Sequence, residues 1–347
     1  MIGLPFTIVK PKLSEQELTL LSSEIVGQHI LKLDLDRFWR RLEGCPVNQK
    51  IMFLDQGCPD PINADAFVNE KYSHVPSGTF IDGGGHGAHT FCICLAIHNN
   101  NYGIKGVSIT GLGGSGKVIE DNGVGALEYY MNGLKTAIDN GYDFVNASIG
   151  SEAPLWQEIK DLQKEAKEKS VSIQIAAGNA YEGLFNTMAE NSHVLSVGSV
   201  SNNKRRSEFS SKSPWLDISA YGEDILSFTT GEDIRPMSGT SQATAVVTGI
   251  LADCKSYAQW KGLDLTVDEL WDIARNTADD IEDDGPDEKT GFGIINPNAM
   301  LDEIDRIIEG APIRTTEPIA EAEKKNPVTA AVIIVIVLSA ILISLFV

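Results

Sequence analysis

The sequence predicts an α/β fold with a mostly parallel central sheet, because short apolar runs alternate with helical segments of about 10 to 15 residues. Strands are expected at 51–54, 143–147, 171–177 and 194–200. Helices are expected at 88–97, 126–140, 155–169, 242–254 and 267–277. Apolar residues make up 42% of the 347, which is enough for a large core. Such sheets bind ligands beyond the carboxyl ends of their strands, so we expect the site there.

Charge and cysteine content narrow the class of protein. The formal net charge is -20, and such a surface repels phosphate backbones, so nucleic acid is not expected as a partner. The five cysteines have no disulfide-like spacing, which indicates reduced thiols.

Three residues able to perform nucleophilic and acid–base chemistry stand at element boundaries. Asp55 ends the apolar run at 51–54, His86 lies in a glycine-rich turn before a helix, and Ser241 begins another helix. A serine hydroxyl needs a neighbouring base, and the base needs a third group to fix its tautomer. Asn179 follows Ala-Ala-Gly at the end of a strand, where its amide can donate to an oxyanion. Each residue alone could be a cap or a turn, but their order and placement together favour catalysis.

These motifs resemble the subtilisin-like (subtilase) serine peptidases, over about residues 50 to 305. The motifs are Asp55-Gln56-Gly57, His86-Gly87-Ala88-His89, Ala176-Ala177-Gly178-Asn179 and Gly239-Thr240-Ser241-Gln242-Ala243. The resemblance implies a three-layer subtilisin-like fold over 49–310, with helices on both faces of the sheet. It also implies a catalytic triad of Asp55, His86 and Ser241, with Asn179 in the oxyanion hole.

Some positions depart from the family pattern. Gln56 replaces the usual Ser or Thr, and Thr90-Phe91-Cys92 replaces a Val-Ala-Gly-like run. Ala245 stands where the family usually has Pro in the nucleophile helix. None of these changes removes a catalytic group.

The resemblance further implies a cleft in which an extended peptide pairs with two exposed strands. Gly123-Val124-Gly125 resembles one of them, and Ser148-Ile149-Gly150 resembles the other, which also lines the specificity pocket. Ordinary turn glycines are the alternative explanation. No cofactor is required, but calcium is common in the family. The loop around Asn100 and the acidic loop 279–284 are candidate calcium sites, although solvated loops are the preferred interpretation of both.

The flanks predict a membrane anchor and an N-terminal extension. Residues 328–347 are 20 residues without charge, Gly or Pro, which as a transmembrane helix would span about 30 Å of lipid bilayer. Residues 311–327 are interpreted as a flexible stalk. Residues 1–48 form an extension that includes a predicted helical stretch, 13–30. Its Leu4-Pro5-Phe6 resembles the cleft-blocking motif of intracellular family members.

The basic pair Lys324 and Lys325 before the anchor, together with the lack of a signal-peptide pattern, favours a cytoplasmic catalytic domain on a single-pass membrane protein. The predicted function is that of a membrane-tethered serine endopeptidase acting on polypeptides. One alternative is a catalytically weak pseudoprotease that binds extended peptides at the membrane surface. A second alternative keeps the chemistry but places the domain on the outer side.

Overall fold

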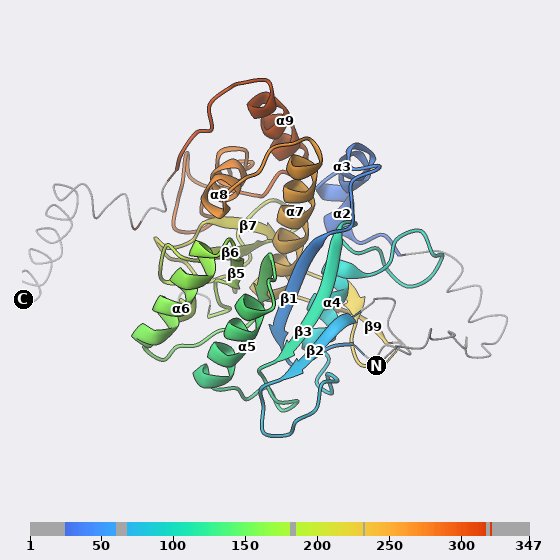
Figure 1. Cartoon of the computed structure of the whole chain (residues 1–347), viewed down its shortest axis with the longest axis vertical. Helices are drawn as coiled ribbons and strands as arrows, with labels where there is room; N and C mark the ends of the chain where they lie inside the picture. Colours follow the sequence, from blue (N-terminus) through green and yellow to red (C-terminus); the bar gives the residue numbers. More distant parts are fainter. Residues whose placement is uncertain (1–24, 60–67, 181–184, 232, 317–319, 321–347) are drawn as a thin grey trace, which may run out of the picture.

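The computed structural model of the protein describes residues 25–59, 68–180, 185–231, 233–316 and 320. A seven-stranded sheet in the order β2-β3-β1-β4-β5-β6-β7 forms its centre, and every neighbouring pair is parallel (Figure 1). The strands are β1 (Gln49–Asp55), β2 (Val68–Ser73), β3 (Gly111–Lys117), β4 (Phe144–Ala147), β5 (Ser172–Ala176), β6 (Leu195–Val200) and β7 (Ile218–Tyr221). The predicted parallel sheet is therefore confirmed.

Helices cover both faces of this sheet and complete the three predicted layers. One core lies under α4 (His86–Leu95), α7 (Thr240–Trp260), α8 (Val267–Asn276) and α9 (Pro297–Ile308). A second core lies under α5 (Leu127–Asp139) and α6 (Gln157–Glu168) on the opposite face (Figure 1). In β1, Ile51 and Phe53 join the first core, whereas Met52 and Leu54 join the second. A strand buried on both faces in this way has a continuous apolar sequence.

Several elements were not predicted from the sequence, and β3 explains why. Its sequence GLGGSGK contains no β-branched or aromatic residue, so local propensity does not indicate a strand. The structure gives a tertiary reason for two of its glycines. A Cβ at Gly113 would come within 2.3 Å of the Phe91 ring, and one at Gly114 within 2.0 Å of the Tyr142 hydroxyl. The other unpredicted elements are α3 (Leu35–Arg41), β2, β7, α9, the short helix η1 (Thr187–Ala189) and the antiparallel pair β8 (Ile225–Phe228) and β9 (Ile234–Met237).

The described part of the N-terminal extension packs onto the first core. It forms α2 (Gln28–Lys32) and α3 (Leu35–Arg41), and the side chains of Leu35 and Phe38 are fully buried. Trp39 Nε1 donates to the Val107 carbonyl at 2.8 Å. Arg41 forms ion pairs with Asp302 and Asp305 of α9, at 2.6 and 2.7 Å. Residues 13–24 of the predicted helix 13–30, and the motif at 4–6, lie outside the described residues.

Only part of the C-terminal region for which a stalk and a membrane helix were predicted is among the described residues. Among the described residues, no helix has both the length and the apolarity needed to cross a membrane. The predicted membrane segment 328–347 lies outside those residues. The described start of the predicted stalk is bound to the domain, since Thr316 donates from N and Oγ1 to Asp272, and Ala320 N donates to the Pro214 carbonyl.

Candidate active site

Three neighbouring strands present predicted site residues at one edge of the sheet. Asp55 is the last residue of β1, Ser148 follows β4, and Asn179 follows β5. These strands are adjacent in the order β1-β4-β5, and parallel strands direct their carboxyl ends to the same edge. The site therefore lies where the α/β pattern predicted it.

The carboxylate of Asp55 is buried and held by three donors. Its Oδ1 accepts from Gln56 N at 2.7 Å and contacts His86 Nδ1 at 2.8 Å, and its Oδ2 accepts from Thr90 Oγ1 at 3.2 Å. Because a carboxylate can only accept, Nδ1 of His86 carries the proton and Nε2 is left as the basic nitrogen. The structure therefore pairs two of the three predicted triad residues.

The charge of Asp55 also changes the basicity of His86. Burial acts to lower the pKa of His86, but the nearby Asp55 carboxylate, its hydrogen bond and the charge of Asp82 together outweigh burial, so the pKa is raised from the usual 6.5. A third of the His86 side chain stays exposed (33%), which leaves the ring accessible from the surface.

Asp82 fixes the start of α4, the helix that begins with His86. Its Oδ1 accepts from Gly84 N and Gly85 N, at 2.9 and 2.8 Å, and its Oδ2 accepts from Ala88 N at 2.7 Å. Gly85 has φ +91°, a conformation that residues with a side chain rarely adopt. The glycine-rich sequence before His86 therefore serves a tight turn whose backbone donors bind one carboxylate.

Ser241, on the first turn of α7, is locked to Ser148 by two reciprocal hydrogen bonds. Ser241 Oγ donates to the Ser148 carbonyl at 3.0 Å, and Ser148 Oγ donates to the Ser241 carbonyl at 2.8 Å. Asn146 Nδ2 donates to Ser148 Oγ at 2.9 Å. In the described part of the chain, the hydroxyl of Ser241 thus bonds to Ser148 rather than to His86.

Thr240 orients the side chain of Asn179. Asn179 Oδ1 accepts from Thr240 N at 2.9 Å and from Thr240 Oγ1 at 3.0 Å. Thr240 therefore binds the acceptor end of the side chain, and Nδ2 is its donor end.

A pocket of about 350 Å³ brings together half of the predicted site residues. Ser241, Asn179 and the whole segment 148–150 line it, together with Ser151, Glu152, Ala176, Gly178, Ala180, Phe185, Asn186 and Thr240. Asn186 fixes the walls, because its Nδ2 donates to the carbonyls of Ile149 and Ala176, at 3.0 and 2.7 Å. The pocket is thus rigidly bounded on the side predicted to accept a substrate side chain.

The second predicted peptide-binding segment lies apart from this pocket. Gly123, Val124 and Gly125 do not line it, and Val124 is 63% exposed. The segment is a turn closed by Glu120 N donating to the Val124 carbonyl at 2.9 Å. Neither it nor segment 148–150 belongs to a strand of the described sheets. Their roles in binding an extended peptide remain predictions.

Thr90 and Gln56, which depart from the family pattern, contact the predicted catalytic residues. Thr90 lies one helical turn after His86 and donates to Asp55. Gln56 Oε1 accepts from His86 N at 3.3 Å, and its Nε2 donates to the Glu120 carbonyl at 3.2 Å. The i, i+4 spacing of His86 and Thr90 on one helix was the only signal in the sequence that could have indicated the first of these contacts.

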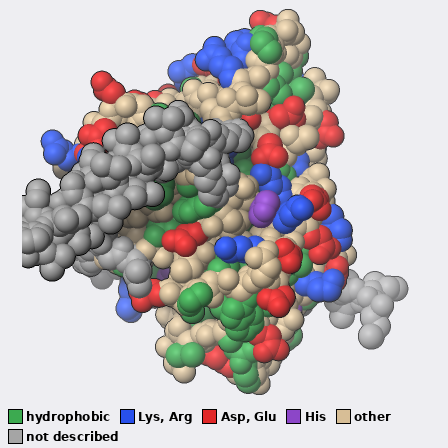
Figure 2. All heavy atoms as spheres, turned by 90° about the vertical axis from the view of Figure 1, so that its left-hand side faces the viewer, with side chains coloured by type: hydrophobic (Ala, Val, Ile, Leu, Met, Phe, Trp, Pro, Cys, Tyr) green, Lys and Arg blue, Asp and Glu red, His purple; other side chains and the backbone are tan. Residues whose placement is uncertain are grey.

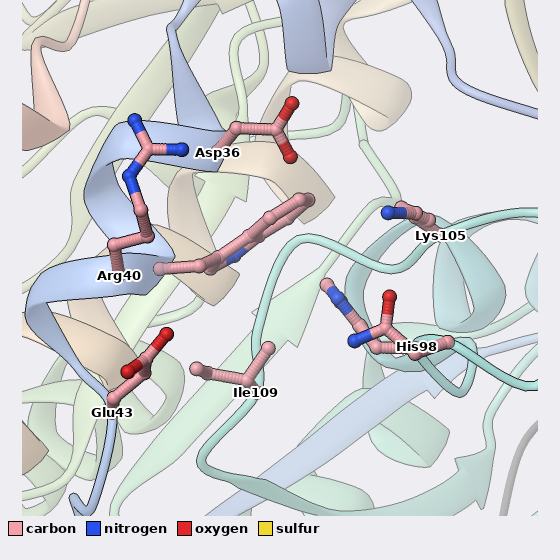
Figure 3. A pocket seen from close by; sticks show the side chains of 8 residues that line it. Asp36, Arg40, Glu43, His98, Lys105 and Ile109 are labelled. Atoms are coloured by element: carbon pink, nitrogen blue, oxygen red, sulfur yellow. The ribbon is translucent and has the colours of Figure 1, made fainter.

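The two candidate calcium loops remain predictions. In the described residues, no group of three His, Cys, Asp or Glu side chains is placed to hold a metal ion. Asn100 Oδ1 already accepts from Tyr102 N at 3.0 Å. Beside this loop, a hollow of about 400 Å³ is lined by both basic and acidic side chains, among them Arg40, Lys105, Asp36 and Glu43 (Figure 3).

In the acidic loop 279–284 several carboxylates have partners. Asp283 pairs with Lys289 at 2.6 Å, and Glu282 accepts from Arg206 N at 3.0 Å. We therefore assign calcium no step in the chemistry.

On the face shown in Figure 2, acidic and basic side chains are interspersed over the described residues rather than gathered in one basic patch. The prediction that nucleic acid is not a partner rests on the net charge of the chain and stays a prediction.

A carboxylate–imidazole pair, with a serine and an amide donor at the same edge of a parallel sheet, is typical of a serine hydrolase. Comparison with known protein families matches residues 43–293 to the subtilase family. The chain belongs to the subtilase family, and it is accordingly a subtilisin-like serine protease, a hydrolase of peptide bonds.

Individual relatives agree with this assignment. The major intracellular serine protease of Bacillus subtilis (strain 168) is 32% identical over 231 residues, which cover 61% of this chain and 70% of the relative. The intracellular serine protease of Paenibacillus polymyxa is 31% identical over 252 residues, covering 67% and 74%. Subtilisin E of Bacillus subtilis (strain 168) is 32% identical over 211 residues, and the match spans 59% of this chain but only 55% of that relative.

Proposed function

We propose that the chain is an endopeptidase in which Ser241 is the nucleophile, His86 the general base, Asp55 the orienting carboxylate and Asn179 an oxyanion donor. The observation that carries this proposal is the 2.8 Å contact between Asp55 Oδ1 and His86 Nδ1, which leaves Nε2 as a base whose pKa is raised. Ser241 and Asn179 lining one pocket supports the remaining two roles.

The proposed reaction runs through an acyl-enzyme. Ser241 Oγ attacks the carbonyl carbon of the scissile bond while its proton passes to His86 Nε2, and the carbonyl oxygen becomes an oxyanion. Asn179 Nδ2 and the Ser241 backbone N–H donate to that oxyanion. His86 then gives its proton to the leaving amine, the C–N bond breaks, and water releases the acyl group by the reverse sequence.

The hydrogen bond from Ser241 to Ser148 belongs to the state of the enzyme before substrate binds. It holds the nucleophile at 3.0 Å from a backbone carbonyl until a substrate enters, and the hydroxyl must then turn toward His86. Catalytic hydrogen bonds are often completed only when substrate is bound. A peptide lying along segments 123–125 and 148–150 would supply that trigger by pairing with their backbone groups.

A fluorophosphonate probe tests the nucleophile directly. We expect covalent labelling of the wild-type chain and none of Ser241→Ala, with Ser192→Ala as the control, because Ser192 is partly exposed and does not line the pocket. Wild-type chain that binds an extended peptide but is never labelled would instead establish the rival function, a peptide-binding pseudoprotease. The observation that favours this alternative function is that the Ser241 hydroxyl donates to the Ser148 carbonyl.

We also propose that residues 328–347 tether the enzyme to a membrane, with the catalytic domain on the cytoplasmic side. The uncharged 20-residue segment supports the tether, and the printed names of two relatives, both called intracellular serine proteases, support the side. Full-length chain should sediment with membranes and resist extraction by alkaline carbonate, whereas chain ending at residue 320 should not. Trypsin should spare the domain in intact spheroplasts, and its digestion there would place the domain outside.

A further inference from the structure

Lys117 is a fully buried cation at the end of β3. It pairs in register with Asp55 on β1, so it lies beside the strand end that carries the carboxylate. Its ammonium donates to the Gln56 carbonyl at 2.5 Å, to the Ile81 carbonyl at 3.2 Å and to the carboxylate of Asp121. An ammonium has three N–H donors, so all of its capacity is used.

Packing alone does not account for a lysine at this position. Removing a charge from water is costly, and replacing a buried ion pair by apolar residues of similar volume is often neutral or stabilising. A methionine could fill the same channel without that cost. The position of the three acceptors suggests what the charge contributes instead.

Each acceptor belongs to a different segment of the site. Gln56 directly follows Asp55, and Ile81 directly precedes Asp82, which binds the first turn of α4. Asp121 lies in segment 120–125, which holds the exposed turn predicted to pair with substrate. One ammonium therefore contacts the carboxylate strand, the approach to the histidine helix and the turn.

Further hydrogen bonds join the same three segments around Lys117. Asp121 Oδ1 also accepts from Gly83 N at 3.0 Å, which ties the turn to the loop before His86. Gln56 bridges His86 N and the Glu120 carbonyl. The hydrogen bond from Lys117 lowers the pKa of Asp121, so this half-exposed carboxylate stays charged in the pH range where His86 is neutral.

We infer that Lys117 is a positioning residue that couples the substrate-binding turn 120–125 to the Asp55–His86 pair. This rests on the proposed function. Without the ammonium, the turn and the pair lose their common anchor, so the geometry of proton transfer and the binding of long peptides both deteriorate. A residue that only supported the fold would change stability without linking these two properties.

The test compares Lys117→Met and Asp121→Asn with wild type. Each variant is assayed for its rate of fluorophosphonate labelling, which reports the serine and its base, and for the ratio of kcat/KM between a long and a short peptide, which reports the turn. We expect Lys117→Met to lower both values about tenfold, and Asp121→Asn to lower both by a smaller factor. Thermal unfolding identifies any variant that does not fold, and the exposed site of Asp121 keeps a folded variant available.

Lys135→Met and Asp139→Asn are the matched controls, because these residues form an exposed ion pair on α5, at 3.1 Å, away from the site. If a folded variant lowers only the labelling rate, only the long-to-short kcat/KM ratio, or neither, the coupling is overturned. The proposed function would remain intact. Wild-type chain that is not labelled at Ser241 would overturn both.

Discussion

Replacing Asp55 by asparagine should remove the charge beside His86 and keep the contacts around it. An asparagine Oδ1 can accept from Gln56 N and His86 Nδ1, as the carboxylate Oδ1 does now. The new amide would face Thr90 Oγ1, which can accept as well as donate. We therefore expect Asp55→Asn to fold like wild type, so that any change in rate reports the lost charge.

The expected loss in rate follows from the geometry. His86 becomes positively charged when it takes the serine proton, and two opposite charges about 4 Å apart attract by about 4 kcal/mol near a protein surface. The surface value applies because 33% of the His86 side chain is exposed. Since about 1.4 kcal/mol corresponds to a factor of ten in rate, kcat should fall roughly 10³-fold.

The pH dependence has a definite sign. Burial is the largest single effect and lowers the pKa of His86, but the charge and hydrogen bond of Asp55, together with the charge of Asp82, raise it above 6.5. His86 acts as a base only when neutral, so wild-type kcat/KM should fall as the pH drops through this raised pKa. In Asp55→Asn the charge of Asp55 is gone while burial and the smaller effect of Asp82 remain, so the acid limb should move to lower pH.

Stopped-flow or continuous assay of a chromogenic peptide between about pH 5 and 9 measures both quantities. Asp139→Asn is the control, because that carboxylate lies on α5 and is 53% exposed. An acid limb at the same pH in Asp55→Asn and wild type would refute the assignment of His86 as the base held by Asp55.

Three further substitutions have expected outcomes. Thr90→Val removes a hydrogen bond to the Asp55 carboxylate and should lower kcat about tenfold at constant KM; an altered KM alone would contradict this role. Asn179→Ala should lower kcat about 10²- to 10³-fold and slow fluorophosphonate labelling, and unchanged labelling would remove it from the oxyanion hole. Arg275→Met leaves the buried carboxylate of Asp217 without its 2.7 Å partner and should lower the free energy of unfolding by about 3–5 kcal/mol in urea. A change below about 1 kcal/mol would show that this buried pair contributes little.

The residues of the proposed triad could be predicted as candidates because each stands in a distinctive local sequence. Asp55 follows an apolar run, His86 follows glycines that a tight turn requires, and Ser241 lies at the start of a helix. A residue type at the end of a strand or the start of a helix can be recognised in the sequence. The contact of Asp55 with His86 is shown only by the structure.

The supporting contacts were not predictable, because they depend on tertiary approach. The strand β3 is a run of glycines whose reason lies in Phe91 and Tyr142, far away in the sequence. Lys117 at its end resembled an ordinary surface lysine, and only the parallel pairing of β3 with β1 buries it beside Asp55. Gln56 was noticed as an unusual residue, but its two partners come from separate loops.

The helices α2 and α3 are part of the folded domain, although they lie before the residues that match the family. Leu35 and Phe38 fill the interior beneath α9, and Arg41 neutralises two of its carboxylates. A chain starting at residue 43, where the family match begins, would lose these buried side chains and the ion pairs of Arg41 with α9. A cut that leaves both helices in place must therefore fall before Gln28.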